Sequence, residues 1–126
     1  MRAHLLLQRA EEILDEKKST PQRRPTQIAA FLIRQALEEA VAGHCERLIT
    51  RLDHPVTMRS RLTVLHLFDQ TGAAETAEYT WNALSRACHH HAYELAPTAS
   101  ELQHLLALVR QLVPPTTTDQ PPGVST

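Results

Sequence analysis

The 126-residue chain is poor in aromatic residues, glycine and cysteine, and it carries almost no net charge. Phe, Tyr and Trp make up 4% of the residues, too few for a platform on which successive bases of a single strand could stack. Two cysteines, Cys45 and Cys88, cannot build a disulfide scaffold, and we expect no secretory signal. A formal net charge of −1 argues against a strong, sequence-independent grip on nucleic acid, but it allows a local phosphate site.

Long hydrophobic runs and strand patterns are also missing. The longest apolar run extends from Ile28 to Ile33, whereas a membrane-spanning helix needs about 20 such residues. No stretch alternates between polar and apolar residues with the period of two that a half-buried strand requires. We therefore expect a helical protein that is soluble, cytoplasmic and without a membrane partner.

Apolar residues recur instead at helical spacing, and the chain length suits a single domain. Local signals mark several helix ends: Thr26 is expected to be an N-cap, Gly72 to form a left-handed turn, and Thr98 to Glu101 to form a capping box. The pattern predicts an all-α fold, an up-and-down bundle of four to five helices in residues 1–113 followed by a disordered tail in 114–126. The expected helices cover residues 2–18, 27–52, 57–68, 73–95 and 99–113.

The fourth of these helices carries apolar or packing residues at alternating spacings of three and four. This narrow seam predicts nearly parallel packing, either against a neighbour within the bundle or against a second copy of the chain. The sequence leaves these two alternatives open. The seam consists of Ala74, Ala77, Trp81, Leu84, Cys88, His91 and Leu95.

The most unusual stretch, residues 85–93, lies at the end of this helix and contains one arginine, three histidines and a tyrosine. At about 100° per residue, His90 and Tyr93 lie on the helix face of Arg86, whereas His91 belongs to the apolar seam. A buried imidazole without a partner costs about 1–3 kcal/mol, so His91 needs a hydrogen bond or a polar cleft. A satisfied core histidine is the simplest interpretation.

The spacing Arg86-x4-His91-x-Tyr93 resembles the motif of the HEPN family, small all-helical proteins many of which are ribonucleases of toxin–antitoxin and defence systems. The motif also lies late in a long helix, as in that family. One position departs from the pattern, because Ala87 follows the arginine where catalytic members usually have a polar residue. The resemblance covers residues 2–113 in architecture, but its specificity comes from three residues.

The resemblance implies a homodimer whose two motifs face each other and cleave RNA without a metal ion or cofactor. His91 would transfer protons as general acid or base, and Arg86 would bind the scissile phosphate. His90 would assist at the phosphate, and Tyr93 would hydrogen-bond it. In toxin members of the family, a partner nucleotidyltransferase antitoxin can modify the equivalent tyrosine, which adds such an antitoxin to the expected partners.

Two other interpretations of the sequence remain. Ala87 and the near-zero net charge are compatible with a non-catalytic, degenerate HEPN module that binds a nucleotide or a protein. A metal-binding bundle that uses Cys88, His91 and His44 is the third interpretation, although the chain lacks any recognised zinc-ligand spacing.

Overall fold

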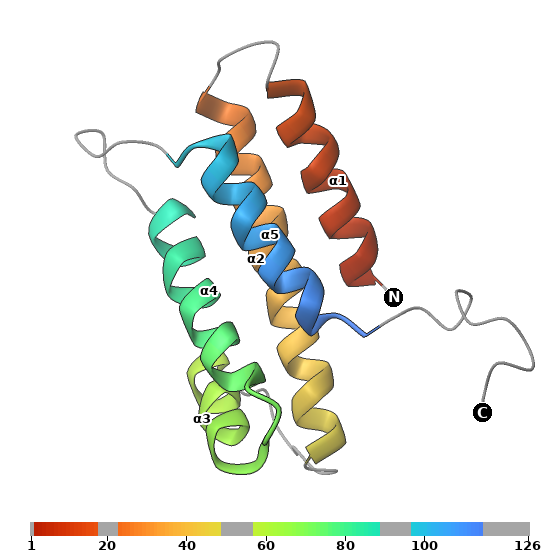
Figure 1. Ribbon diagram of the computed structural model, residues 1–126, viewed down its shortest axis with the longest axis vertical. Coiled ribbons are helices and arrows are strands. Elements are labelled where there is room, and N and C mark those ends of the chain that lie inside the picture. Colours follow the sequence, from red (N-terminus) through yellow and green to blue (C-terminus); the bar gives the residue numbers. More distant parts are fainter. Residues whose placement is uncertain (1, 18–22, 49–56, 89–96, 115–126) are drawn as a thin grey trace, which may run out of the picture.

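The structure, a computed structural model, describes residues 2–17, 23–48, 57–88 and 97–114. These residues form five helices and no strand, which confirms the predicted all-α bundle (Figure 1). None of these helices is both long enough and apolar enough to cross a membrane. The helices are α1 (Arg2–Lys17), α2 (Arg23–Leu48), α3 (Met58–Phe68), α4 (Ala73–Cys88) and α5 (Ala99–Leu112).

Helix α2 is the central element, because it contacts each of the other four helices. Helices α1, α4 and α5 surround it, with α5 lying between α1 and α4 and contacting both (Figure 1). The short α3 packs against α2 and α4 at the end of the bundle where α2 ends. Neighbouring α1 and α2 run in opposite directions, as do α4 and α5, which is the expected up-and-down arrangement.

The core is built from the apolar stripes that the helical spacing predicts. Alanines with no exposed surface, among them Ala3, Ala10 and Ala29, let α1 and α2 approach each other closely. Large side chains then fill the space between the helices, and burial of each one stabilises the fold by about 1.5–3 kcal/mol. The largest that are completely buried are Leu7, Leu14, Ile33, Leu37, Leu65, Leu84 and Leu102.

Two of the predicted helix starts are correct, and one is wrong. Thr57 and Thr98 cap α3 and α5, and their hydroxyl oxygens accept hydrogen bonds from the N–H groups of Ser60 at 3.1 Å and Glu101 at 3.0 Å. Thr26 is not an N-cap, because α2 already begins at Arg23 and Thr26 is completely buried. A proline is tolerated in the first turn of a helix, where its missing N–H needs no partner, so the helix includes Pro25.

A tight turn joins α3 to α4 and makes them an antiparallel pair. Gly72 has a φ of 88°, the left-handed conformation that the sequence predicted. A carboxylate oxygen of Asp69 accepts hydrogen bonds from the hydroxyl of Thr71 at 2.6 Å and its N–H at 3.0 Å, and from the N–H of Ala73 at 3.3 Å. The same turn thus ends α3 and caps the start of α4.

The buried face of α4 is wider than a two-position seam. Ala74, Ala77 and Leu84 are buried as predicted, but Thr80 and Ala87 are buried too. All of these positions face helices of the same chain, so the expectation of a narrow seam is wrong, and its described part belongs to the core of the monomer. The seam positions His91 and Leu95 lie outside the described residues, as does the predicted tail from residue 115 onward.

Candidate functional site at the end of α4

Of the residues in the Arg-x4-His-x-Tyr motif, the structure describes Arg86, which is exposed on the last turn of α4. It forms no ion pair with any described residue, in contrast to Arg110, which binds the carboxylate of Glu11 at 2.8 Å. The predicted site residues His90, His91 and Tyr93 lie outside the described residues. The structure therefore provides the position of the phosphate-binding candidate and of the helix that carries it.

Ala87, the departure from the HEPN pattern, points into the core and is only 7% exposed. Consecutive residues of a helix are about 100° apart, so the neighbour of an exposed Arg86 can lie on the packed side. A polar side chain at this position would need a buried hydrogen-bond partner. The bundle thus has a packing reason for alanine here, and the chemistry of the site has to come from Arg86 and the residues that follow.

A cluster of side chains from α2 and α4 fixes the turn that precedes the motif. The guanidinium of Arg34 lies over the ring of Trp81, 4.4 Å from its centroid, in a cation–π contact. Its Nε is 3.9 Å from a carboxylate oxygen of Glu38 on the next turn of α2. Arg34 also hydrogen-bonds the thiol of Cys88, so one α2 side chain contacts α4 on both sides of Arg86 in the sequence.

The thiol of Cys88 is held in its neutral form. Partial burial raises the pKa of Cys88, and the positive charge and hydrogen bond of Arg34 only partly oppose this effect. The pKa of Cys45 is also raised, chiefly by burial, and its thiol donates a hydrogen bond to the carbonyl of Arg61 at 3.4 Å. Neither cysteine therefore offers a nucleophilic thiolate at neutral pH.

The structure separates two of the ligands of the metal-binding interpretation. His44 donates a hydrogen bond from Nε2 to the carbonyl oxygen of Leu112 at 2.9 Å, near the end of α5. Cys88 contacts Arg34, which lies ten residues earlier on α2, or about 15 Å along the helix axis. Within the described part of the chain, no three His, Cys, Asp or Glu side chains are grouped as a metal site would require.

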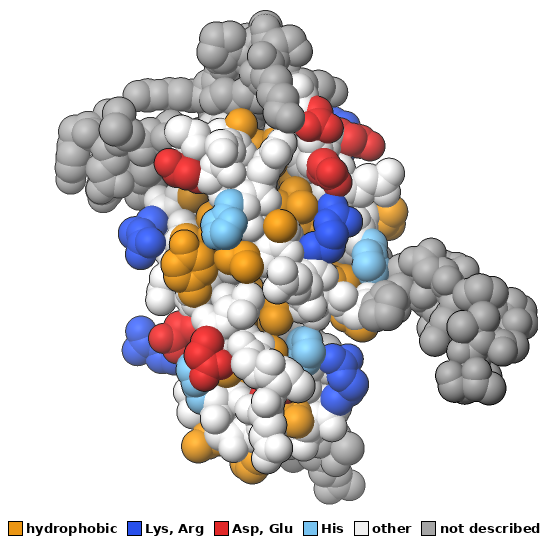
Figure 2. Space-filling model, viewed as in Figure 1, with side chains coloured by type: hydrophobic (Ala, Val, Ile, Leu, Met, Phe, Trp, Pro, Cys, Tyr) orange, Lys and Arg blue, Asp and Glu red, His pale blue; other side chains and the backbone are white. Residues whose placement is uncertain are grey.

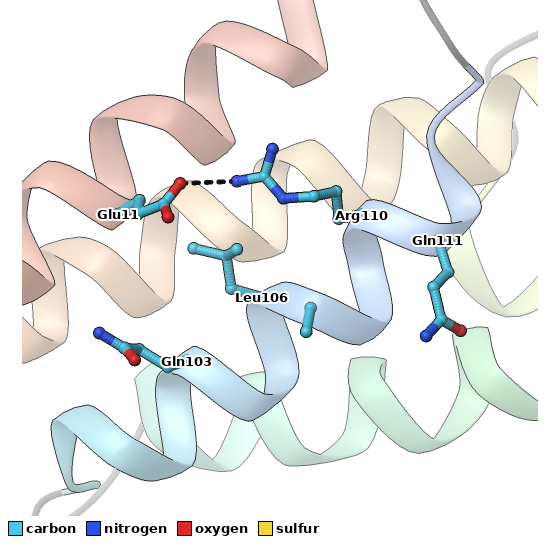
Figure 3. A pocket seen from close by; sticks show the side chains of 6 residues that line it. Glu11, Gln103, Leu106, Arg110 and Gln111 are labelled. Carbon is cyan, nitrogen blue, oxygen red and sulfur yellow. Dashed lines mark hydrogen bonds and ion pairs between the residues drawn. The ribbon is translucent and has the colours of Figure 1, made fainter.

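The face shown in Figure 2 carries both acidic and basic side chains, with acidic ones grouped at the upper right and no extended basic patch. A pocket of about 350 Å³ between α1 and α5 has Leu106 as its apolar floor (Figure 3). Arg110 points across this pocket to Glu11, and their ion pair neutralises both charges. This pocket therefore lacks a free cation for a phosphate and is no alternative to the end of α4.

Sequence reasoning missed the role of Arg34. The sequence contained a sign of this role, because the charged Arg34 lies between the buried apolar residues Ile33 and Leu37. Its contact with Trp81, however, depends on how α2 and α4 are aligned, which the sequence alone does not specify.

No protein-family model, curated protein or solved structure matches this chain. The likeness to the HEPN family consequently depends on the motif residues and on the helical architecture.

Proposed function

We propose that this chain is a HEPN-like, metal-independent endoribonuclease of the toxin–antitoxin or defence type that acts as a cytoplasmic homodimer. The observation that carries the proposal is Arg86, exposed and without an ion pair to any described residue, at the end of a bundle helix. The sequence places His91 and Tyr93 at the family spacing after it. An arginine in this state is available for a phosphate, because no described carboxylate competes for its guanidinium.

The proposed reaction is an attack of a ribose 2′-oxygen on the adjacent phosphorus. The bond from phosphorus to the 2′-oxygen forms while the bond to the 5′-oxygen breaks, and the leaving oxygen takes up a proton. An imidazole with an ordinary pKa of about 6.5 can remove the first proton or deliver the second, which is the role of His91. Arg86 binds the phosphate oxygens, where its planar fork stabilises the charge that develops.

Two further residues of the stretch have supporting roles in the proposal. His90 is one turn from Arg86 in the sequence and adds a second donor for the phosphate. Tyr93 donates a hydrogen bond to the phosphate and is the expected target if a nucleotidyltransferase-type antitoxin modifies the protein. A second copy of the chain completes the site in this proposal, because two residues five positions apart would diverge by about 140° if both lay on one helix.

RNA cleavage in the presence of EDTA tests this proposal. We expect the untagged protein to cleave a mixed RNA substrate, and we expect His91→Ala to lower the rate by about 10²-fold or more. Arg86→Ala should lower it to a similar extent. Arg47→Ala is the matched control, because Arg47 is an exposed arginine in the last turn of α2 and should leave the rate unchanged. Equal rates for wild type and His91→Ala would refute the nuclease.

A non-catalytic role in nucleotide or protein binding is the second candidate. It is favoured by the buried Ala87, which leaves the position after Arg86 without a polar group, and by the mixed charges of the surface. In that case a nucleotide or a protein should bind without any RNA being cleaved, and Arg86→Ala should leave the cellular phenotype intact.

A further inference from the structure

A second pocket, of about 270 Å³, lies between α3 and α4 on the side of α4 that leads to Arg86. Asn82 lines it, and Arg86 is four residues further along, one turn away on the same helix face. The pocket differs from the one between α1 and α5 because its walls combine an aromatic ring, an amide, a hydroxyl and a guanidinium. The residues that supply these groups and close the pocket are Arg59, Thr63, His66, Glu78, Trp81 and Asn82.

Trp81 forms part of the pocket wall, and a contact with α2 holds its ring in position. The guanidinium of Arg34 lies 4.4 Å from the ring centroid, and Arg34 is itself held by Glu38 and Cys88. The ring is only partly buried, so some of its surface is left for a ligand. A ring held in this way loses little conformational freedom on binding, which favours the stacking of a planar base.

The two ends of the pocket differ in charge. The imidazole Nε2 of His66 and a carboxylate oxygen of Glu78 are hydrogen-bonded at 2.7 Å, so these two residues lie side by side on the antiparallel helices α3 and α4. Seven residues back along α3 is Arg59, and seven residues forward along α4 is Ser85, so these two lie at the same level. Arg59 and Arg86 therefore both lie at the end nearest the motif, about 10 Å from the level of Glu78.

Both arginines are exposed, and neither forms an ion pair with a described residue. Two exposed guanidinium groups at one end of the α3–α4 pair make that end positive. A phosphate group is the anion that suits two planar donors of this kind. At the other end of the pocket, the hydrogen bond between His66 and Glu78 engages both side chains.

We propose that this pocket binds one nucleotide of a single-stranded RNA, the one adjacent to the phosphate held by Arg86. The base lies against Trp81, and the amide of Asn82 and the hydroxyl of Thr63 bind its polar edge. Arg59 contacts the same phosphate from α3. The inference rests on the proposed function, because it extends the RNA site from the motif along α4, and it makes the pocket a determinant of which nucleotide flanks the cut.

Trp81 is the only tryptophan of the chain, so its fluorescence reports directly on the pocket. The probe is a 2′-O-methyl hexauridylate, which can bind but cannot be cleaved by attack of a 2′-oxygen. We expect saturable quenching of Trp81 fluorescence in the full-length protein. Arg59→Ala should raise the Kd by about tenfold, the loss expected for one charged hydrogen bond, and the matched control Arg47→Ala should leave it unchanged.

Equal affinities for Arg59→Ala and Arg47→Ala, or the absence of saturable quenching, would overturn the inference. Two variants of Trp81 test whether the aromatic ring itself contributes to binding. Trp81→Phe keeps a ring and should retain binding of a fluorescein-labelled probe, whereas Trp81→Ala should weaken this binding at least fivefold. Cleavage assays separate this inference from the nuclease proposal. Quenching without cleavage supports nucleotide binding in the pocket and refutes the nuclease. Cleavage without quenching supports the nuclease and refutes nucleotide binding in the pocket.

Discussion

Replacement of Leu84 by alanine tests whether the apolar face of α4 belongs to the core of the monomer or to a subunit interface. The Leu84 side chain is completely buried among helices of its own chain. The substitution removes three carbon atoms at about 0.8 kcal/mol each, which gives a loss of about 2.4 kcal/mol before any cavity is counted. With the cavity, the free energy of unfolding should fall by about 2–5 kcal/mol.

Urea denaturation followed by circular dichroism measures this loss. With a slope of about 1–2 kcal/mol per M for a domain of this size, the midpoint should fall by at least about 1 M. Leu67→Ala is the matched control, because the Leu67 side chain is 70% exposed, and it should change stability by less than about 0.5 kcal/mol. A loss below 1 kcal/mol for Leu84→Ala would refute the placement of Leu84 in the core. So would an unchanged monomer stability combined with weaker self-association in sedimentation equilibrium.

Two further substitutions test local features of the fold by the same denaturation assay. Gly43→Ala should stabilise the protein by about 0.5–1 kcal/mol, because an added Cβ would meet nothing closer than the Arg47 guanidinium at 3.9 Å; a loss would reveal a close contact. Asp69→Ala should destabilise the protein at pH 7. The hydrogen bond from the Thr71 hydroxyl is the main cause that lowers the pKa of the Asp69 carboxyl, so its contribution is present above the ordinary pKa of about 3.9 and is lost as the pH falls through the lowered value. The stabilities of wild type and Asp69→Ala should therefore converge as the pH falls below the lowered pKa of Asp69, and a difference that does not change with pH would contradict this explanation.

Local signals in the sequence specify much of this fold. The capping signal at Thr98 identified the start of α5, the helical spacing placed the start of α3 near residue 57, and the only glycine in a four-residue turn identified the left-handed position at Gly72. Each of these features depends on a few neighbouring residues, so the local sequence is sufficient to predict it. The helix start at Thr26 was predicted wrongly, because Pro25 can either precede a helix or occupy its first turn.

Long-range features could not be predicted in the same way. The contact of Arg34 with Trp81 and the separation of His44 from Cys88 both depend on the relative positions of α2, α4 and α5. The position of Arg59 relative to Arg86 along the helix axes could be predicted in part. Once the turn at Gly72 is recognised, counting residues away from it in both directions places the two arginines at the same end of the α3–α4 pair.

We propose that the motif functions across two copies of the chain. This claim is tested most directly by mixing the variants Arg86→Ala and His91→Ala, each inactive alone, and measuring RNA cleavage after subunit exchange. If each site takes Arg86 from one chain and His91 from the other, every mixed dimer contains one intact site. An equal mixture should then recover about a quarter of wild-type activity, since half of the dimers are mixed and half of their sites are intact. Subunit exchange without any recovery of activity would contradict the claim.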